Sequence, residues 1–210
     1  MTLIKICGIT TLEDAVACVS AGADALGFNF YPRSRRYVTP DRVRQITDRL
    51  PRDILTVGVF VNERSTDIVR EICDAARVTA VQLHGDESPE YCAALADRFV
   101  IKVVRAKGYG DEDPEQYGTG ALMVDTFDEQ EHGGTGRVSD WSFARKVGLL
   151  TPKLFLAGGL SPENVAAAVK VVEPYAVDAC SALESAPGRK DEDRVRDFVQ
   201  AVHHRQLDIG

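Results

Sequence analysis

The sequence has few cysteines, no long apolar run and no cluster of metal-binding side chains. Its five cysteines are odd in number, lie scattered along the chain and follow no metal-ligand spacing. This usage is typical of a reducing cytoplasm, so we expect neither structural disulfides nor a bound metal. No apolar stretch approaches membrane-spanning length, and no basic leader with an apolar core opens the chain. The composition therefore predicts a cytoplasmic protein without a membrane partner.

Positive charge is scarce as well. The chain carries 25 Lys and Arg residues against 32 Asp and Glu residues, which gives a net charge of −7. This balance argues against a nucleic-acid partner and provides no general attraction for anions. An acidic substrate would therefore have to be held by local cations and backbone amides. An early G-x-G-x-x-G motif is also absent, and we expect no cofactor.

Strand-like apolar runs alternate with helical patterns along the whole chain, and no linker separates them. The predicted strands cover residues 3–7, 24–29, 54–61, 78–84, 99–105, 120–125, 153–157 and 175–180. The predicted helices cover residues 12–21, 40–50, 64–76, 88–98, 140–147, 162–172 and 190–204. Eight alternating units without a hairpin signal favour parallel strands. A closed barrel and an open doubly wound sheet both fit. The eight units and the missing dinucleotide motif favour one (β/α)8 TIM barrel domain over residues 1–210.

Several connections carry local signals of their own. Three predicted helices begin with a capping residue and a first-turn proline, at Thr39-Pro40, Ser88-Pro89 and Ser161-Pro162. The fifth connection, 106–119, is rich in Gly, Asp and Glu, so its helix should be short or irregular.

Cys7 ends the first predicted strand. Side-chain alternation puts Lys5 and Cys7 on one face and two isoleucines, Ile4 and Ile6, on the other. The apolar pair should face the helices, which turns the lysine and the thiol toward the barrel interior. A cation one layer below a thiol favours the thiolate, the form that acts as base or nucleophile. Because catalytic groups in such barrels project from C-terminal strand ends, Cys7 is a candidate catalytic residue. A buried structural cysteine is the alternative.

Other polar residues also follow strand ends. Asp125 leaves a buried strand, where partial desolvation would raise its pKa and suit it to proton donation. The next loop carries the glycine-rich segment 133–136, which could close over a ligand. The alternative is an aspartate that caps a helix or braces a loop. His84 shares a face with Gln82 and is either catalytic or a hydrogen-bonded core histidine. His84 and Asp178 are the next candidates for an acid.

Two loops predict binding of anions. Gly158-Gly159 ends the seventh strand just before a helix, and Ser181 follows the eighth strand. Glycines let backbone amides approach an anion, and these two connections often form a phosphate site. The second connection carries three arginines, which could hold a carboxylate through paired hydrogen bonds: Arg33, Arg35 and Arg36. The alternative for Gly158-Gly159 is a tight turn that binds no ligand. The alternative for the arginine loop is a solvated basic loop.

With these motifs the chain resembles the phosphoribosylanthranilate isomerases of tryptophan biosynthesis over nearly its whole length. Each motif is weak alone, but their ordered set is specific. In order, they are Lys5-Ile6-Cys7-Gly8, Ser34 to Val38, Gly58-Val59-Phe60-Val61-Asn62, Val81-Gln82-Leu83-His84-Gly85, Val124-Asp125, Gly133-Gly134-Thr135-Gly136, Asp140-Trp141 and Leu156-Ala157-Gly158-Gly159-Leu160. The resemblance implies an Amadori rearrangement of N-(5′-phosphoribosyl)anthranilate to 1-(2-carboxyphenylamino)-1-deoxy-D-ribulose 5-phosphate, which needs no metal or redox step.

The resemblance also implies roles for individual residues. Cys7 matches the general base, Asp125 the general acid, and Arg36 the arginine that holds the anthranilate carboxylate. The phosphate-binding role carries over to Gly158, Gly159, Ser181 and Ala182. Additional candidates for the site are Lys5, His84 and Asp178.

The chain departs from the family pattern in two places. Arg35 stands where a proline usually precedes the key arginine. In the strand-eight motif Asp-x-Ser-Ser-Gly-x-Glu, Cys180 and Ala182 replace a serine and the glycine. The methyl group of Ala182 could hinder a phosphate or demand a different backbone angle, although we still expect the phosphate to bind.

Two other functions remain as alternatives. An aminoimidazole carboxamide ribotide isomerase performs the same reaction type, but that family is expected to use an aspartate where this chain has Cys7. A non-catalytic barrel that senses a sugar phosphate would not need to retain both Cys7 and Asp125. In each case the partner is a small molecule, and the chain is expected to be a monomer or a homodimer.

Overall fold

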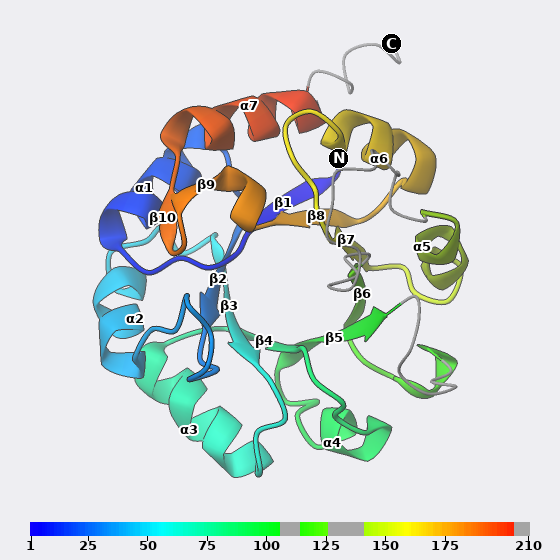
Figure 1. The fold of residues 1–210 in the computed structure, drawn as a ribbon. Coiled ribbons are helices and arrows are strands. Elements are labelled where there is room, and N and C mark those ends of the chain that lie inside the picture. The colour runs from blue at the N-terminus through cyan, green and yellow to red at the C-terminus, as the bar shows by residue number, and fades with distance from the viewer. Residues whose placement is uncertain (106–113, 126–140, 204–210) are drawn as a thin grey trace.

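Eight parallel strands close into a barrel in the computed structural model, which describes residues 1–105, 114–125 and 141–203 (Figure 1). The strands are β1 Leu3–Ile6, β2 Ala25–Asn29, β3 Leu55–Phe60, β4 Ala80–Leu83, β5 Phe99–Arg105, β6 Ala121–Asp125, β7 Leu154–Ala157 and β8 Ala176–Ala179. They pair in chain order, and β8 also pairs with β1. This last pairing confirms the closed barrel and excludes the open sheet.

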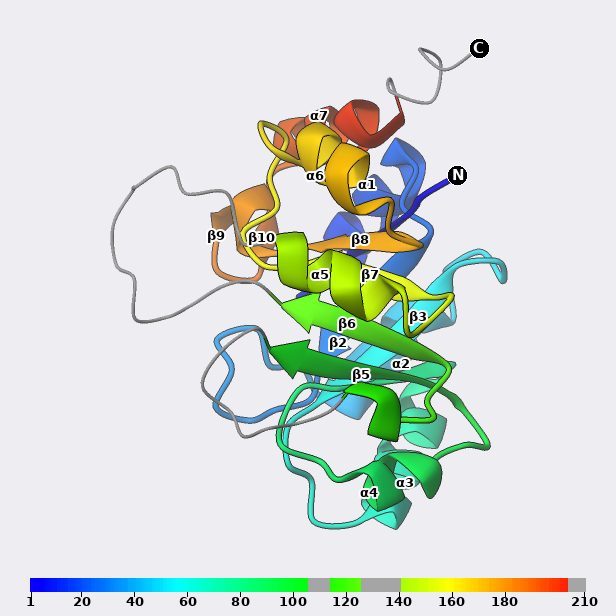
Figure 2. The same ribbon diagram turned by 90° about the vertical axis from the view of Figure 1, so that its right-hand side faces the viewer.

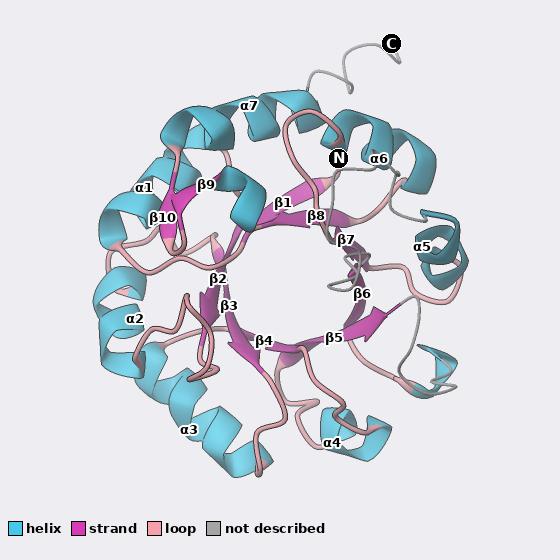
Figure 3. Cartoon of the chain, in the orientation of Figure 1, coloured by secondary structure: helices cyan, strands magenta, loops and turns pink. Residues whose placement is uncertain are grey.

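Helices alternate with the strands and surround them (Figure 3). They are α1 Leu12–Ala21, α2 Pro40–Thr47, α3 Thr66–Ala76, α4 Pro89–Ala93, α5 Trp141–Gly148, α6 Val165–Val172 and α7 Glu192–His203, with 3-10 turns η1 Pro114–Gln116 and η2 Ser181–Leu183. The caps predicted at Thr39 and Ser88 are confirmed, since each hydroxyl accepts a first-turn amide at 3.3 Å. Within the described residues, no helix is long and apolar enough to cross a membrane.

The period-two alternation of the strands divides the buried side chains into two layers. Ile4 and Ile6 belong to the larger cluster between the barrel and its helices. Lys5, between them in the sequence, is wholly buried on the opposite face of the strand, as predicted. The barrel interior is filled by a second cluster made of Val57, Ala80, Ile101, Val103, Ala121, Met123, Phe155, Ala157 and Ala176. The barrel is thus a packed core with chemistry confined to its ends.

An antiparallel hairpin follows β8, which the sequence pattern did not predict. Its strands are β9 Glu184–Ala186 and β10 Arg189–Lys190, joined through Pro187-Gly188 with Gly188 at φ +80°. The Pro-Gly pair is a turn signal, but strands of three and two residues are too short to show alternation. Figure 2 shows the hairpin at the end of the barrel toward which the strand arrows point.

Candidate active site

Cys7 lies just beyond the end of β1. Its N–H donates to the carbonyl oxygen of Ala179 on β8 at 2.9 Å, which holds the cysteine beside the end of that strand. The side chain is partly buried. A Cβ atom on Gly27 of β2 would come within 2.7 Å of Cys7 Sγ, so this glycine makes room for the sulfur. The thiol occupies the strand-end position that the sequence predicts for a catalytic group.

The surroundings hold the pKa of Cys7 well below the usual range of a thiol. The largest cause is a hydrogen bond from Cys180. Burial acts in the opposite direction, but the charges of Lys5, Lys190 and His84 lower the pKa further. The thiolate is therefore the favoured form of Cys7, as the lysine beneath it predicts.

Lys5 and Asp178 form an ion pair inside the barrel, on the layer below Cys7. Lys5 Nζ lies 2.8 Å from Asp178 Oδ1. Burial raises the pKa of Asp178 to about 7; Lys5 opposes this rise, and the negative charges of Cys7 and Asp125 add to it. Burial also acts to lower the pKa of Lys5, yet Asp178 and Cys7 raise it above its ordinary value. The lysine therefore stays charged beneath the thiol.

Asp125 and His84 meet at the mouth of the barrel. Asp125 ends β6 and His84 follows β4, and His84 Nε2 lies 3.3 Å from Asp125 Oδ2. On the other side of the ring, Gln82 Nε2 lies 3.0 Å from His84 Nδ1. The ring is therefore held between Gln82 and the carboxyl group of Asp125. The glycine-rich segment 133–136, predicted to close over a ligand, lies outside the described residues.

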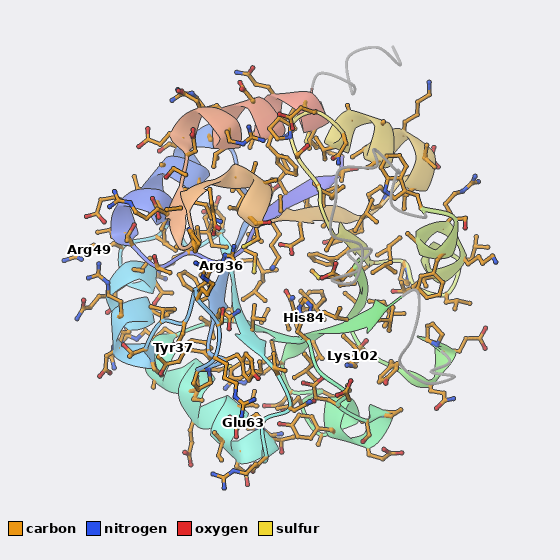
Figure 4. The ribbon with its side chains drawn as sticks, in the orientation of Figure 1. Arg36, Tyr37, Arg49, Glu63, His84 and Lys102 are labelled. Carbon is orange, nitrogen blue, oxygen red and sulfur yellow. The ribbon has the colours of Figure 1, made fainter. Side chains whose placement is uncertain are left out.

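Arg36 lies beside the hairpin, above β2 (Figure 4). Its Nε and Nη2 donate to the two carboxylate oxygens of Glu184 at 2.8 and 2.7 Å, and Lys190 Nζ donates to the same carboxylate at 3.1 Å. Burial acts to raise the pKa of Glu184, but the hydrogen bonds and charges of Arg36 and Lys190 lower it. Arg33 and Arg35, the other arginines of this loop, are exposed.

The loop after β7 differs from its prediction. The helix expected to begin at Ser161-Pro162 begins only at Val165. Asn164 lies at its N-terminal end, where its side chain accepts from the Ser161 amide at 2.9 Å and donates to the Gly159 carbonyl at 2.9 Å. These two hydrogen bonds hold the segment before Val165 in a turn, so the helix begins three residues later than predicted. Gly158 and Gly159 have φ values of +91° and +64°, a region that other residues rarely adopt.

The loop after β8 lies next to that after β7, because Leu156 and Val177 are partners across the two strands. Ser181 is exposed and Ala182 partly exposed, both in η2. Ala182 does not have a positive φ. The backbone angle at this position therefore suits alanine, and the replacement of glycine introduces no strain.

Sequence reasoning missed two charged residues of the site. Glu184 is separated from Arg36 by 148 positions, so no local pattern links them. The sequence signal for Glu184 was its position as the last residue of the strand-eight motif. Lys190 lies in a hairpin strand too short to recognise, and no sequence signal marks it. Among the described residues, no group of three or more His, Cys, Asp or Glu side chains could hold a metal ion.

Comparison with known proteins identifies the family. A family model of N-(5′-phosphoribosyl)anthranilate (PRA) isomerase matches residues 4–201. The N-(5′-phosphoribosyl)anthranilate isomerase of Geobacter sulfurreducens is 48% identical over 201 residues, covering 95% of this chain and 98% of that protein. The crystal structure of phosphoribosyl anthranilate isomerase from Thermotoga maritima matches with a TM-score of 0.89 at 42% identity, covering 97% of this chain and 100% of that one.

A second crystal structure adds a ligand to the comparison. It is a phosphoribosyl anthranilate isomerase in complex with reduced 1-(o-carboxyphenylamino)-1-deoxyribulose 5-phosphate. It matches with a TM-score of 0.86 at 40% identity, covering 97% of this chain and 100% of that one. On the strength of the family model and of these relatives, the chain belongs to the N-(5′-phosphoribosyl)anthranilate isomerase family.

Proposed function

We propose that the protein converts N-(5′-phosphoribosyl)anthranilate into 1-(2-carboxyphenylamino)-1-deoxy-D-ribulose 5-phosphate, with Cys7 as general base and Asp125 as general acid. The observation that carries these roles is a thiolate-favouring cysteine and a histidine-paired carboxyl group at one end of the barrel. The reaction opens a sugar ring and moves hydrogen between neighbouring carbons. It therefore needs an acid and a base, and consumes no oxidant.

Asp125 supplies the first proton. Protonation of the furanose ring oxygen lets the C1′–O bond break and leaves an iminium ion conjugated to the anthranilate ring. His84 Nε2, at 3.3 Å, holds the carboxyl group in position for this transfer. The same carboxyl group can later recover a proton from the product side, which completes the cycle.

Cys7 then removes the proton from C2′. The iminium ion makes this proton acidic, and the resulting enolamine becomes the ketone when C1′ gains a proton and the C2′ hydroxyl loses one. A base is effective when it is deprotonated at the working pH. The hydrogen bond from Cys180 and the charge of Lys5 maintain the thiolate in the free enzyme.

Two anion sites would hold the ends of the substrate. At one end, the guanidinium group of Arg36, held in position by Glu184, would bind the anthranilate carboxylate. At the other end, the backbone of Gly158-Gly159 and of Ser181-Ala182 lies on adjacent strand ends and suits the phosphate.

The alternatives account for these features less well. An aminoimidazole carboxamide ribotide isomerase is expected to carry an aspartate where this chain has Cys7, and the family match is to the other isomerase. A sugar-phosphate sensor has no use for a thiol whose pKa is lowered by its surroundings.

The decisive experiment is a fluorescence assay for the loss of phosphoribosylanthranilate, with the purified protein and its Cys7→Ala variant. We expect turnover by the parent protein and a loss of about 10²- to 10⁴-fold in kcat for the variant, the range for removal of a general base. Product binding, measured by titration, should be retained. A variant with the parent kcat would remove Cys7 from the mechanism.

Domain organisation, location, oligomeric state and partners complete the proposal. The chain forms one domain over residues 1–210 and works in the cytoplasm as a monomer or homodimer, without a nucleic-acid or membrane partner. A relative from Thermotoga maritima, from which monomers have been generated, is dimeric. Sedimentation of the purified protein distinguishes the two oligomeric states.

A further inference from the structure

Cys7 and Cys180 lie side by side at the ends of two paired strands. In the parallel ladder of β1 and β8, Lys5 is opposite Asp178, and the Cys7 amide still bonds to the residue before Cys180. One more step of this register puts the two cysteines next to each other. Paired strands lie about 4.8 Å apart, within the roughly 4.4–6.8 Å between Cα atoms that a disulfide spans.

The two side chains also point the same way. Residues two apart share a face of a strand, and Lys5 and Asp178 meet inside the barrel at 2.8 Å. Cys7 and Cys180 therefore project to that same side, one layer nearer the mouth, where each thiol is the largest influence on the pKa of the other. A Cβ atom on Gly8 would come within 2.8 Å of Cys180 Sγ, so the glycine after Cys7 leaves space for the second sulfur.

The two thiols differ in the way that a reactive and a resolving cysteine differ. The pKa of Cys7 is lowered, whereas the hydrogen bond to Cys7 and burial raise the pKa of Cys180. Both residues are partly exposed, while Cys18, Cys73 and Cys92 are buried. Since thiolate character and access govern oxidation, Cys7 is the thiol that a peroxide should reach first.

We propose that Cys7 and Cys180 are a redox pair that a hydroperoxide oxidises to a disulfide and a dithiol reduces again, which reversibly stops the isomerase. First the Cys7 thiolate attacks hydrogen peroxide: an S–O bond forms, the O–O bond breaks, and the sulfur is oxidised to a sulfenic acid while the other oxygen leaves as hydroxide, which takes a proton from solvent to become water. Cys180 then attacks this sulfur, the S–O bond breaks, and hydroxide leaves with the Cys180 proton as water.

The loss of activity follows from the base assignment and so depends on the proposed function. A disulfide sulfur carries no negative charge and cannot accept the C2′ proton. Disulfide formation itself depends only on the geometry of the two cysteines. The two parts can therefore be measured separately.

The test treats the purified protein with hydrogen peroxide and divides it for thiol counting, peptide mass spectrometry and activity. Trypsin places Cys7 in peptide 6–33 and Cys180 in peptide 171–189. We expect two thiols to disappear, these peptides to become linked, and kcat to fall by about 10²-fold or more. Dithiothreitol should restore both the thiols and the activity.

Two variants control the result. Cys180→Ser, which carries serine in place of the second thiol, should form no link, and peroxide should carry its Cys7 to a sulfinic acid that dithiothreitol does not reverse. Cys18→Ala, in the same tryptic peptide as Cys7, should retain the link. Loss of the link in Cys18→Ala, or a parent protein whose two peptides stay unlinked after peroxide treatment, would overturn the redox pair. A linked protein with full activity would leave the pair standing and overturn Cys7 as the base.

Discussion

At the scale of single residues, the charges around Cys7 are in place before any substrate arrives. Lys5 is buried beneath the thiol in an ion pair, and Lys190 adds positive charge from the hairpin. Groups held in this way need no reorganisation during the reaction, which is how fixed charges assist a transition state. Because these charges are present without substrate, the pKa of Cys7 can be measured in the free protein.

The alkylation of Cys7 by iodoacetamide should reveal its low pKa. Only the thiolate reacts, so the rate should level off at a lower pH than for an ordinary thiol with a pKa of about 8.5. Cys180→Ala removes the hydrogen bond that most lowers this pKa, and should move the midpoint to higher pH. Cys18, whose pKa burial raises to about 12, is an internal control that should react slowly. An unchanged midpoint in Cys180→Ala would contradict the assignment of cause.

Asp125→Asn should reduce kcat by about 10²- to 10⁴-fold with little change in KM, because the missing proton transfer occurs in the transition state. Asparagine keeps the size and can still contact His84. Steady-state kinetics on the purified variant measure both constants. If KM alone rises, Asp125 is a binding residue, and Asp178, whose pKa is raised to about 7, becomes the acid to test.

Arg36→Met should raise KM and weaken product binding by about tenfold or more, the usual effect of losing hydrogen bonds to a charged group. Arg33→Met is the matched control from the same loop, and should change little because the Arg33 side chain is exposed. Isothermal titration with product measures both. An equal loss in Arg35→Met would show that the carboxylate is shared between neighbouring arginines.

At the scale of elements, one buried ion pair joins β5 to the ends of β3 and β4. Lys102 of β5 donates to Glu87 at 2.9 Å and to the Gly85 carbonyl at 2.5 Å. Glu87 in turn accepts from the amides of Asn62, after β3, and of Gly85, after β4, at 2.9 and 3.0 Å. His84 directly precedes Gly85, so this network also positions the partner of Asp125. Both charged side chains are almost wholly buried.

Lys102→Met should destabilise the fold by about 3–5 kcal/mol, because it leaves the buried Glu87 carboxylate without its counterion. Urea unfolding followed by circular dichroism measures the change. The double variant Lys102→Met/Glu87→Gln removes the charge as well and should recover part of the loss. A single variant within about 1 kcal/mol of the parent protein would mean that the pair contributes little.

At the scale of elements, some strands, helices and contacts could be predicted from the sequence and others could not. The eight strands were predictable because strands that are buried on both faces read as short apolar runs, such as Leu154–Ala157. The strand-end positions of Cys7 and Asp125 follow from the strand limits alone. The short hairpin 184–190 and the late start of α6 depend on loop contacts, such as those of Asn164, that no periodicity reports. The pairing of Arg36 with Glu184 depends on closure of the barrel.

At the scale of the whole molecule, closure predicts a single cooperative unit, as the one-domain assignment requires. The only tryptophan, Trp141, lies buried in α5, whereas the far-ultraviolet circular dichroism signal averages all helices. Urea unfolding followed by the two signals should therefore give coincident transitions, the usual test of two-state behaviour. Separated midpoints would indicate that the α5 region unfolds independently and would contradict the single domain.

The pairing of β1 with β8 has a further consequence for the chain during its synthesis. Cys7 leaves the ribosome more than 170 residues before Cys180 and Lys190, two of the groups that lower its pKa. The carboxylate partner of Arg36 also comes from the final unit. A nascent chain truncated before β8 thus carries the Cys7 sulfur without Cys180 and Lys190, and its pKa should lie nearer that of an ordinary thiol. The low pKa is therefore established only when β8 has been made and has paired with β1.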